Sequence, residues 1–328
     1  MKVLVTGAFG NVGVSTLLAL LEQGHQIRCF DVPTRANRRR ARRFGKRIEV
    51  IWGDLRDPEA VAAAVVGQEV VIHLAFVIPK LSVTGVDSES NPAWAEAINV
   101  GGTRQLLAAM QTQPKPPGII FTSSVHVYGR TQDSPPPRTI YEQVEPLEHY
   151  SRHKVICERL VRESGLRWMI LRLAATLPLA LRLDREMFQI PLNNRMEFAH
   201  TRDVGQALAN AVTCSEAWGK LLLIGGGERC QYYYREIVSS VLEGLGVGML
   251  PERAFGFTPF CTDWMDSAES EALLHYQQHT LEDYVADMVS MLGWRRRLIR
   301  WFRPVVHWWL LQRSPYYNMA AGAGELVG

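Results

Sequence analysis

KVLVTGAFGNVG, at residues 2–13, is the stretch that decides the fold. A hydrophobic strand ends at Thr6 and a helix begins near Asn11. Glycines stand at the turn between them: Gly7, Gly10 and Gly13. Glycines there permit a tight turn and close approach of the backbone to a pyrophosphate, which the N–H groups of the helix N-terminus would bind. Because the glycines occupy this strand–turn–helix context, they predict a dinucleotide site that includes Asn11 and Val12.

Beyond this unit, short β-branched runs alternate with helix-length amphipathic stretches, a pattern typical of βαβ units around a parallel sheet. Strands are expected near residues 2–6, 26–31, 48–53, 70–74, 118–122 and 167–173. Helices are expected near residues 11–23, 57–66, 93–112 and 150–164. The pattern therefore predicts an α/β fold with a doubly wound parallel sheet.

The chain beyond residue 173 has shorter and less regular elements. Helices are expected near residues 203–214, 234–245 and 280–292, with a strand at 221–224. We expect three parts: a dinucleotide-binding core at 1–173, a small C-terminal α/β substrate lobe interleaved with it at 174–293, and a basic, aromatic segment at 294–328. Such a lobe would lie over the carboxyl edge of the sheet, where open α/β folds bind ligands.

Composition favours a cytoplasmic globular protein. The chain has 328 residues, of which 47% are hydrophobic, so it can bury a large core. No secretory signal is visible at the start, and no apolar run reaches the roughly 20 residues that span a bilayer. The five cysteines are scattered without metal-ligand spacing, which fits reduced thiols and predicts no metal site.

The positive charge is unevenly distributed. The segment 35–47 reads RANRRRARRFGKR and contains no acid, although the formal net charge of the chain is only +3. Its position between two expected strands predicts a solvated helix, with contact to a cofactor phosphate as the alternative. We expect no nucleic-acid partner.

Asp31 closes the second expected strand, about 20 residues after the glycines, where an acid would accept hydrogen bonds from an adenosine ribose. A carboxylate there repels a 2′-phosphate, so NAD is favoured over NADP. Arg35 and Arg38 keep NADP possible, because a nearby arginine can accommodate that phosphate. Asp54 and Leu55, after the third strand, are candidates for adenine contact, or for a simple turn.

Tyr150 and Lys154 stand four residues apart on an expected helix, so their side chains share one face. An ammonium beside a phenol stabilises the phenolate and is expected to lower a tyrosine pKa that is normally about 10. Ser124 follows the strand GIIFTSS, where its hydroxyl could reach the same reacting oxygen. Together with the glycine turn, these residues indicate an alcohol–ketone active site.

Successive motifs along the chain resemble those of extended short-chain dehydrogenases/reductases, the NAD-dependent epimerase/dehydratase group, which have a Rossmann sheet. The motifs are TGAFGNVG (6–13), GDL (53–55), HLA (73–75), NVGGT (99–103), TSSVHVYG (122–129) and Tyr150-x-x-x-Lys154. The resemblance makes Tyr150 the general acid/base, Lys154 the holder of the nicotinamide ribose, and Ser124 the group that polarises the substrate oxygen. It also places Ala75 and Phe76 near the cofactor.

The resemblance assigns Asn99 to the asparagine that fixes the active-site helix. The alternative is an asparagine bonded to its own backbone. The resemblance further implies a homodimer that pairs through the helices near 93–112 and 150–164.

Some positions depart from the pattern of the sugar-nucleotide enzymes in this family. His126 stands where the dehydratases and decarboxylases carry a glutamate, which favours a redox or epimerase reaction over elimination. A histidine exchanges protons near neutral pH, but a structural histidine is the alternative. Arg195 and His200 only partly echo the family's substrate-binding pattern, so they remain candidate substrate contacts while His200 is also a candidate helix start.

The residues predict an NAD(P)-dependent oxidoreductase or epimerase that interconverts a secondary alcohol and a ketone on a small molecule, such as a sugar or nucleotide sugar. Two alternatives remain. One is an NADP-dependent ketone reductase that acts on a hydrophobic nonsugar substrate. The other is a non-catalytic dinucleotide-binding protein.

The segment 294–317, WRRRLIRWFRPVVHWWLLQRSPYY, is not required by redox chemistry. A helix over 298–311 would carry one apolar face flanked by arginines, although Pro304 is expected to kink or break it. That face would pack on the protein's own core or across a dimer. The alternatives are peripheral membrane contact, for which a mixture of tryptophan and arginine is suited, and a lid over a hydrophobic substrate.

Overall fold

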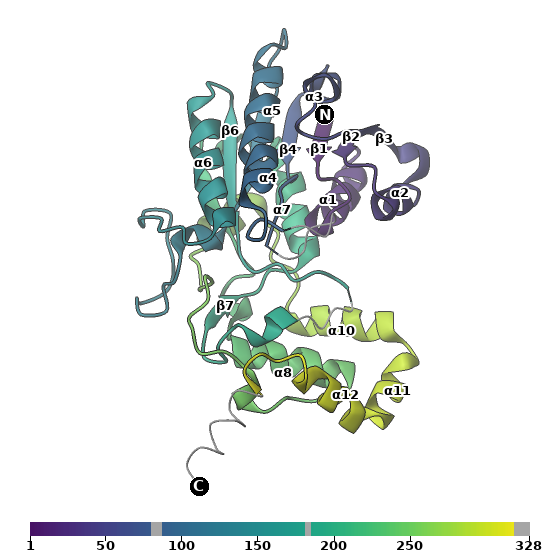
Figure 1. Ribbon diagram of the computed structural model, residues 1–328. Coiled ribbons are helices and arrows are strands. Elements are labelled where there is room, and N and C mark those ends of the chain that lie inside the picture. The colour runs from purple at the N-terminus through teal and green to yellow at the C-terminus, as the bar shows by residue number, and fades with distance from the viewer. Residues whose placement is uncertain (80–86, 181–184, 318–328) are drawn as a thin grey trace.

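The computed structural model describes residues 1–79, 87–180 and 185–317. Its centre is a seven-stranded sheet in the order β3-β2-β1-β4-β5-β6-β8, in which every neighbouring pair is parallel (Figure 1). The strands are β1 (Lys2–Thr6), β2 (Gln26–Asp31), β3 (Ile48–Trp52), β4 (Val70–His73), β5 (Gly118–Ser124), β6 (Trp168–Leu173) and β8 (Leu221–Ile224). This sheet confirms the predicted α/β class.

Helices cover both faces of the sheet, because successive strand side chains point to opposite sides. Val3 and Val5 of β1 belong to one buried cluster, and Leu4 between them belongs to another. The first cluster includes side chains of α1 (Asn11–Glu22) and α7 (Thr201–Thr213). The second includes side chains of α3 (Pro58–Val65), α5 (Gly102–Gln111) and α6 (His149–Glu163).

Local sequence signals set several helix ends. Asp57 accepts hydrogen bonds from the backbone of Glu59 and Ala60, and Pro58 stands in the first turn of α3. Within the basic segment 35–47, the first seven residues form α2 (Arg35–Ala41), whose arginines are exposed, and the last three form a 3₁₀ turn (Gly45–Arg47). The prediction of a solvated helix is thus confirmed.

The strand order reverses at β1, which has β2 on one side and β4 on the other. The carboxyl ends of β1 and β4 therefore meet at the switch point where open α/β sheets bind ligands. There the Thr6 hydroxyl lies 2.7 Å from Nδ1 of His73. The glycine turn and Asp31 lie at this same edge.

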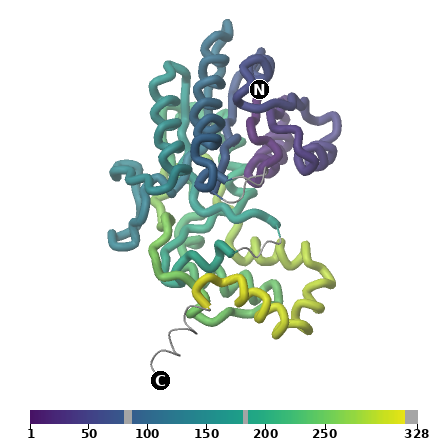
Figure 2. The backbone as a smooth tube through the Cα atoms, viewed as in Figure 1, coloured from purple at the N-terminus to yellow at the C-terminus, as the bar shows by residue number. Residues whose placement is uncertain are grey.

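A smaller lobe with its own apolar core lies below the sheet in Figure 2. Its elements are the antiparallel pair β7 (Arg195–Glu197) and β9 (Gln231–Tyr233), with α8 (Tyr234–Leu245), α10 (Leu281–Leu292), α11 (Arg295–Trp301) and α12 (Arg303–Leu311). Between β7 and β9 the chain returns to the sheet to form α7 and β8, and α9 (Ala268–Leu274) contacts both.

Some expected elements differ in detail. The helix expected at 93–112 consists of α4 (Pro92–Glu96), a π-helical turn (Ala97–Gly101) and α5. The terminal helix is divided at Phe302. Pro304 stands in the first turn of α12, where a backbone N–H has no partner within the helix, so its absence costs no hydrogen bond. The three-residue strands β7 and β9, and α9, were too short to give a periodic signal. Among the described residues, no helix is both long and apolar enough to cross a membrane.

Candidate active site

The glycine turn between β1 and α1 leaves no room for side chains. Gly7 has φ +66°, and a Cβ built on it would lie 2.7 Å from the backbone nitrogen of Ala75. A Cβ on Gly13 would lie 2.5 Å from the Gly7 carbonyl oxygen. Gly10 precedes α1 and gives it no side-chain cap. The N–H groups of the first turn, which include those of Asn11 and Val12, thus remain available, and this bare cradle fits a pyrophosphate.

Asp31 ends β2 with its carboxylate turned to the glycine turn. Oδ2 accepts from the backbone N–H of Phe9 at 2.9 Å, and Oδ1 accepts from Val32 at 2.8 Å and from Nδ2 of Asn37 at 3.0 Å. Burial raises the Asp31 pKa, although the bonds from Phe9 and Val32 oppose that shift. A carboxylate oxygen has two acceptor positions, so Oδ2 of Asp31 can also accept a hydrogen bond from a ribose hydroxyl.

A basic cleft of about 410 Å³ lies beside β3. Its lining is Arg38, Ala41, Arg42, Gly45, Val50 and Trp52. The guanidinium of Arg38 lies 5.3 Å from the centroid of the Trp52 ring, which in turn contacts Phe9 of the glycine turn. Arg38 donates from Nε to the carbonyl oxygen of Pro33 at 3.3 Å, which leaves its other N–H groups for a cofactor phosphate, and Arg40 donates to the carbonyl oxygen of Phe9.

Asp54 and Leu55 have structural partners. Asp54 forms an ion pair with Arg56 at 2.7 Å and also accepts from its backbone N–H. The hydrogen bond from Arg56 holds the Asp54 pKa below its usual value. Leu55 is buried against Gly102, where a Cβ would lie 2.6 Å from that of Leu55. These contacts support the turn alternative, with Leu55 as a core residue.

Ser124 and Tyr150 meet where β5 ends and α6 begins. Burial raises the Tyr150 pKa to about 12, and the Ser124 side chain, which favours the phenolate, only partly opposes this shift. Ser124 Oγ also accepts from the backbone N–H of His126 at 3.3 Å. The structure thus brings the two residues together as predicted, but the expected lowering of the tyrosine pKa was wrong for this state of the site.

Lys154 lies one turn further along α6. Its ammonium donates to the carbonyl oxygen of Thr122 at 2.6 Å and lies 3.6 Å from the centroid of the Phe76 ring. It lies 5.7 Å from the centroid of the Tyr150 ring. Burial lowers the Lys154 pKa to about 7. The ammonium charge is therefore only partly present near neutral pH.

Two glutamates hold the start of α6, and sequence reasoning identified neither. Glu148 caps the helix in a capping box with Ser151, and its carboxylate lies 2.7 Å from Nδ1 of His126. Glu89 accepts from the backbone N–H groups of His149 and Tyr150 at 3.1 and 3.0 Å. An acid directly before an expected helix was a usable signal for Glu148. Nothing local links Glu89 to a helix that begins 60 residues later.

Asn99 is fully buried in the π-helical turn. Its side chain accepts from the backbone N–H of Val77 at 2.7 Å and donates to the Val77 carbonyl oxygen at 3.0 Å. Nδ2 also lies 3.3 Å from Nδ1 of His153 on α6. The asparagine thus links the segment after β4 to the active-site helix, as the resemblance implied, rather than bonding only its own backbone.

His126 contacts the site directly. Its ring packs edge-on against Tyr150 and against Phe260 from the smaller lobe, with centroid separations of 5.8 and 5.4 Å. His126 is therefore at the boundary between the sheet and the lobe. The contact between His126 and Glu148 also supports the alternative that His126 is a structural residue.

Arg195 and His200, the other two candidate substrate contacts, are engaged elsewhere. Arg195 forms an ion pair with Asp263 at 2.7 Å and donates to carbonyl oxygens of residues 131, 132 and 134. His200 is fully buried, caps α7 through the backbone N–H of Arg202, and stacks on His279 at 4.7 Å. These bonds support structural roles for both residues.

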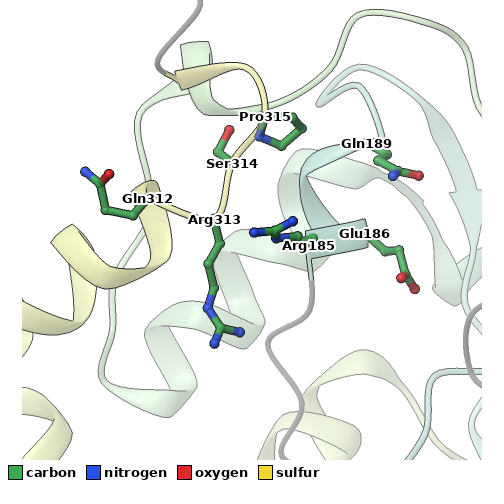
Figure 3. A pocket seen from close by; sticks show the side chains of 7 residues that line it. All are labelled: Arg185, Glu186, Gln189, Gln312, Arg313, Ser314 and Pro315. Carbon is green, nitrogen blue, oxygen red and sulfur yellow. The ribbon is translucent and has the colours of Figure 1, made fainter. Parts of the chain in front are cut away.

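A cavity of about 470 Å³ lies in the smaller lobe, away from the catalytic candidates (Figure 3). Its lining comes from two segments: Arg185, Glu186, Gln189, Gln312, Arg313, Ser314 and Pro315. None of these residues belongs to β5 or α6, the elements that carry Ser124, Tyr150 and Lys154. We therefore place the candidate active site at the switch point rather than in this cavity.

The smaller lobe and the sheet together match solved structures of known fold. A UDP-glucose-4-epimerase from Stenotrophomonas maltophila, solved with bound NAD and formylated UDP-arabinopyranose, aligns with a TM-score of 0.73 at 21% identity. The alignment covers 92% of this chain and 99% of that one. At this identity, the similarity shows the fold alone.

The sequence matches to curated relatives cover about half of the chain. The 3 beta-hydroxysteroid dehydrogenase/Delta 5→4-isomerase of Mycobacterium tuberculosis is 32% identical over 165 residues, which are 49% of this chain and 42% of that protein. UDP-glucose 4-epimerase 3 of Oryza sativa subsp. japonica is 33% identical over 173 residues, 49% of this chain and 44% of that protein. The matches thus span less than half the length of either relative. Residues 3–177 match the family model, and the chain belongs to the NAD dependent epimerase/dehydratase family.

Proposed function

We propose that this chain is an NAD(H)-dependent oxidoreductase or epimerase that interconverts a secondary alcohol and a ketone, with Tyr150 exchanging the proton at the substrate oxygen. The observation that carries the proposal is that Tyr150 packs against His126, whose backbone N–H donates to Ser124 Oγ, one helical turn from Lys154. These groups lie beside the switch point of the sheet, next to the glycine cradle. Their placement supports Ser–Tyr–Lys chemistry.

The protonation states suggest how the residues work. With a pKa of about 12, Tyr150 holds its proton at neutral pH and begins a reduction by donating that proton to the carbonyl oxygen. In the reverse direction the phenolate accepts the hydroxyl proton, and the Ser124 hydroxyl stabilises it. Lys154, with a pKa of about 7, gains a proton most readily when that phenolate carries its negative charge nearby. Bound NAD would supply the hydride acceptor.

The residues of the glycine turn and Asp31 fit NAD. The cradle at Gly7, Gly10 and Gly13 admits a pyrophosphate, and Asp31 Oδ2 offers its second acceptor position to a ribose hydroxyl. The family name and the bound NAD of the S. maltophila enzyme support the same cofactor. NADP is the alternative, because Arg38 lies in the basic cleft beside β3.

The substrate class has two candidates. The rice relative supports a nucleotide sugar. A hydrophobic nonsugar alcohol is favoured by the aromatic surroundings: Phe76 packs edge-on against Tyr150 at 5.8 Å, and Phe260 packs against His126. The structural engagement of Arg195 and His200 also removes two polar contacts that a sugar would use. The mycobacterial relative, a steroid dehydrogenase, agrees with this second candidate.

A paired assay tests the proposal. The purified protein is incubated with NAD and either a panel of 3β-hydroxysteroids or a panel of UDP-hexoses. NADH formation reports a dehydrogenase, and chromatographic separation of UDP-hexose epimers reports an epimerase. Conversion in either panel is the expected result. Tight NAD binding without conversion in any panel would favour a non-catalytic dinucleotide-binding protein instead.

A further inference from the structure

The last two helices present a continuous apolar stripe to solvent. Its members, which we call the Trp stripe, are Trp294, Leu298, Trp301, Phe302, Val305, Trp308 and Trp309. Their exposed fractions run from 42% for Trp309 to 86% for Trp301. Apart from the adjacent pairs Trp301–Phe302 and Trp308–Trp309, they follow one another at spacings of three and four residues, so they lie along one side of α11 and α12. Large apolar side chains are rarely gathered on a free surface in this way.

The opposite side of the same helices is already packed. Leu310 is fully buried, and Ile299, Val306 and Leu311 pack against the core of the smaller lobe. His307 fixes α12 further, since its Nε2 lies 2.7 Å from the carbonyl oxygen of Val247. The helices are therefore held with the Trp stripe outward. The expectation that this face packs on the protein's own core was wrong, whereas packing across a dimer stays a prediction.

Positive charge flanks the stripe without neutralisation. The arginines of this segment are Arg295, Arg296, Arg297, Arg300 and Arg303. The sequence has no Asp or Glu between Asp287 and Glu325, and none of these arginines forms an ion pair within the described chain. A partner that covers the stripe would therefore have to combine an apolar interior with negative charge at its surface.

We propose that α11 and α12 bind an anionic lipid surface. Indole rings are suited to the headgroup region, where their apolar body is buried and their N–H stays near water, and arginines there meet lipid phosphates. Each helix is short, so the pair lies in the plane of the interface with its apolar side inward and does not span the bilayer. In Figure 1 the two helices lie at the end of the smaller lobe remote from the sheet, so attachment leaves the switch point accessible.

Vesicle sedimentation tests this with the full chain. Phosphatidylcholine vesicles are compared with vesicles of phosphatidylcholine and phosphatidylglycerol, at low and high salt. We expect binding to the anionic vesicles that weakens with salt, together with a blue shift of tryptophan fluorescence. The triple variant Arg295→Gln/Arg297→Gln/Arg300→Gln should lose on the order of a hundredfold in partitioning, and Trp301→Ser/Trp308→Ser at least about tenfold.

A control keeps these variants interpretable. Tyr141→Ser removes an equally exposed ring from a loop beside the sheet, and it should bind vesicles as the parent does. The altered side chains are exposed, so all variants should keep the parent's thermal unfolding curve.

Failure to bind anionic vesicles at low salt would overturn the proposal, as would binding that neither set of substitutions reduces. A third contradicting result is self-association that Trp301→Ser/Trp308→Ser abolishes, without vesicle binding, because a second copy of the chain would then cover the stripe.

Discussion

The Glu148 carboxylate lies 2.7 Å from Nδ1 of His126 and also caps the helix that carries Tyr150. One side chain thus fixes both the start of α6 and the ring that packs edge-on against the Tyr150 phenol. Glu148 thus fixes the positions of Tyr150, the acid/base candidate, and of its neighbour His126 relative to each other.

Replacing Glu148 should therefore reduce stability. Glu148→Ala removes the cap and the bond to His126, and is expected to lower the free energy of unfolding by about 1 kcal/mol. Denaturant unfolding measures the change, with Glu145→Ala, an exposed acid of the same loop, as the control. Equal stability of both variants and the parent would contradict the assigned role of Glu148.

Lys154 predicts a pH-dependent stability. Its pKa is about 7 in the folded chain and 10.5 in its ordinary state, so between these values the unfolded chain holds a proton that the folded chain has released. Stability conferred by this residue therefore rises with pH through that window, and the burial penalty is present in full below it. Lys154→Met removes the penalty, so its gain in stability over the parent should be larger at about pH 6 than at about pH 9.

Unfolding of both proteins in denaturant at the two pH values measures that difference. The control is Lys115→Met, which replaces an exposed lysine and should change the free energy of unfolding by the same amount at both pH values. If Lys154→Met changed stability by the same amount at both pH values, the lowered pKa of a buried Lys154 would be refuted.

Asp31 predicts cofactor preference. The parent should bind NADH more tightly than NADPH, because the carboxylate repels a 2′-phosphate. Asp31→Asn keeps the acceptor for the Phe9 N–H but removes the charge, so it should narrow the preference by about tenfold. Fluorescence titration with both cofactors measures it, with Glu22→Gln at the exposed end of α1 as control. Equal or tighter binding of NADPH by the parent would exclude the NAD assignment.

The family resemblance predicts a homodimer that pairs through α5 and α6. Light scattering should then give twice the 37.0 kDa chain mass. The Trp stripe lies on other helices, so Trp301→Ser/Trp308→Ser should leave this mass unchanged. A monomer mass for the parent at working concentrations would count against pairing.

Sequence reasoning predicted the sheet because each strand carries its own β-branched run, and the glycine turn because close backbone approach requires glycine at Gly7 and Gly13. It also paired Tyr150 with Lys154, because spacing on one helix determines which side chains share a face. These are local signals. They extend through the first six strands and weaken beyond residue 173.

The features that sequence reasoning could not predict depend on contacts between residues far apart in the chain. Glu89 accepts hydrogen bonds from α6, and Asp263 forms an ion pair with Arg195. Both contacts join residues that are about 60 or more positions apart in the sequence. The Tyr150 pKa was predicted in the wrong direction, because spacing shows that Lys154 is near but does not show that the Tyr150 phenol itself is buried. Burial is set by the packed protein, and no local pattern encodes it.

The most direct test of the proposed chemistry is the turnover of Tyr150→Phe on the substrate that the paired assay identifies. The substitution removes one hydroxyl from a ring that stays packed against Phe76 and His126. The proposal predicts that kcat falls by roughly 100-fold or more while the Kd for NADH stays the same. An unchanged kcat for Tyr150→Phe would show that Tyr150 is not the acid/base and would contradict the mechanism.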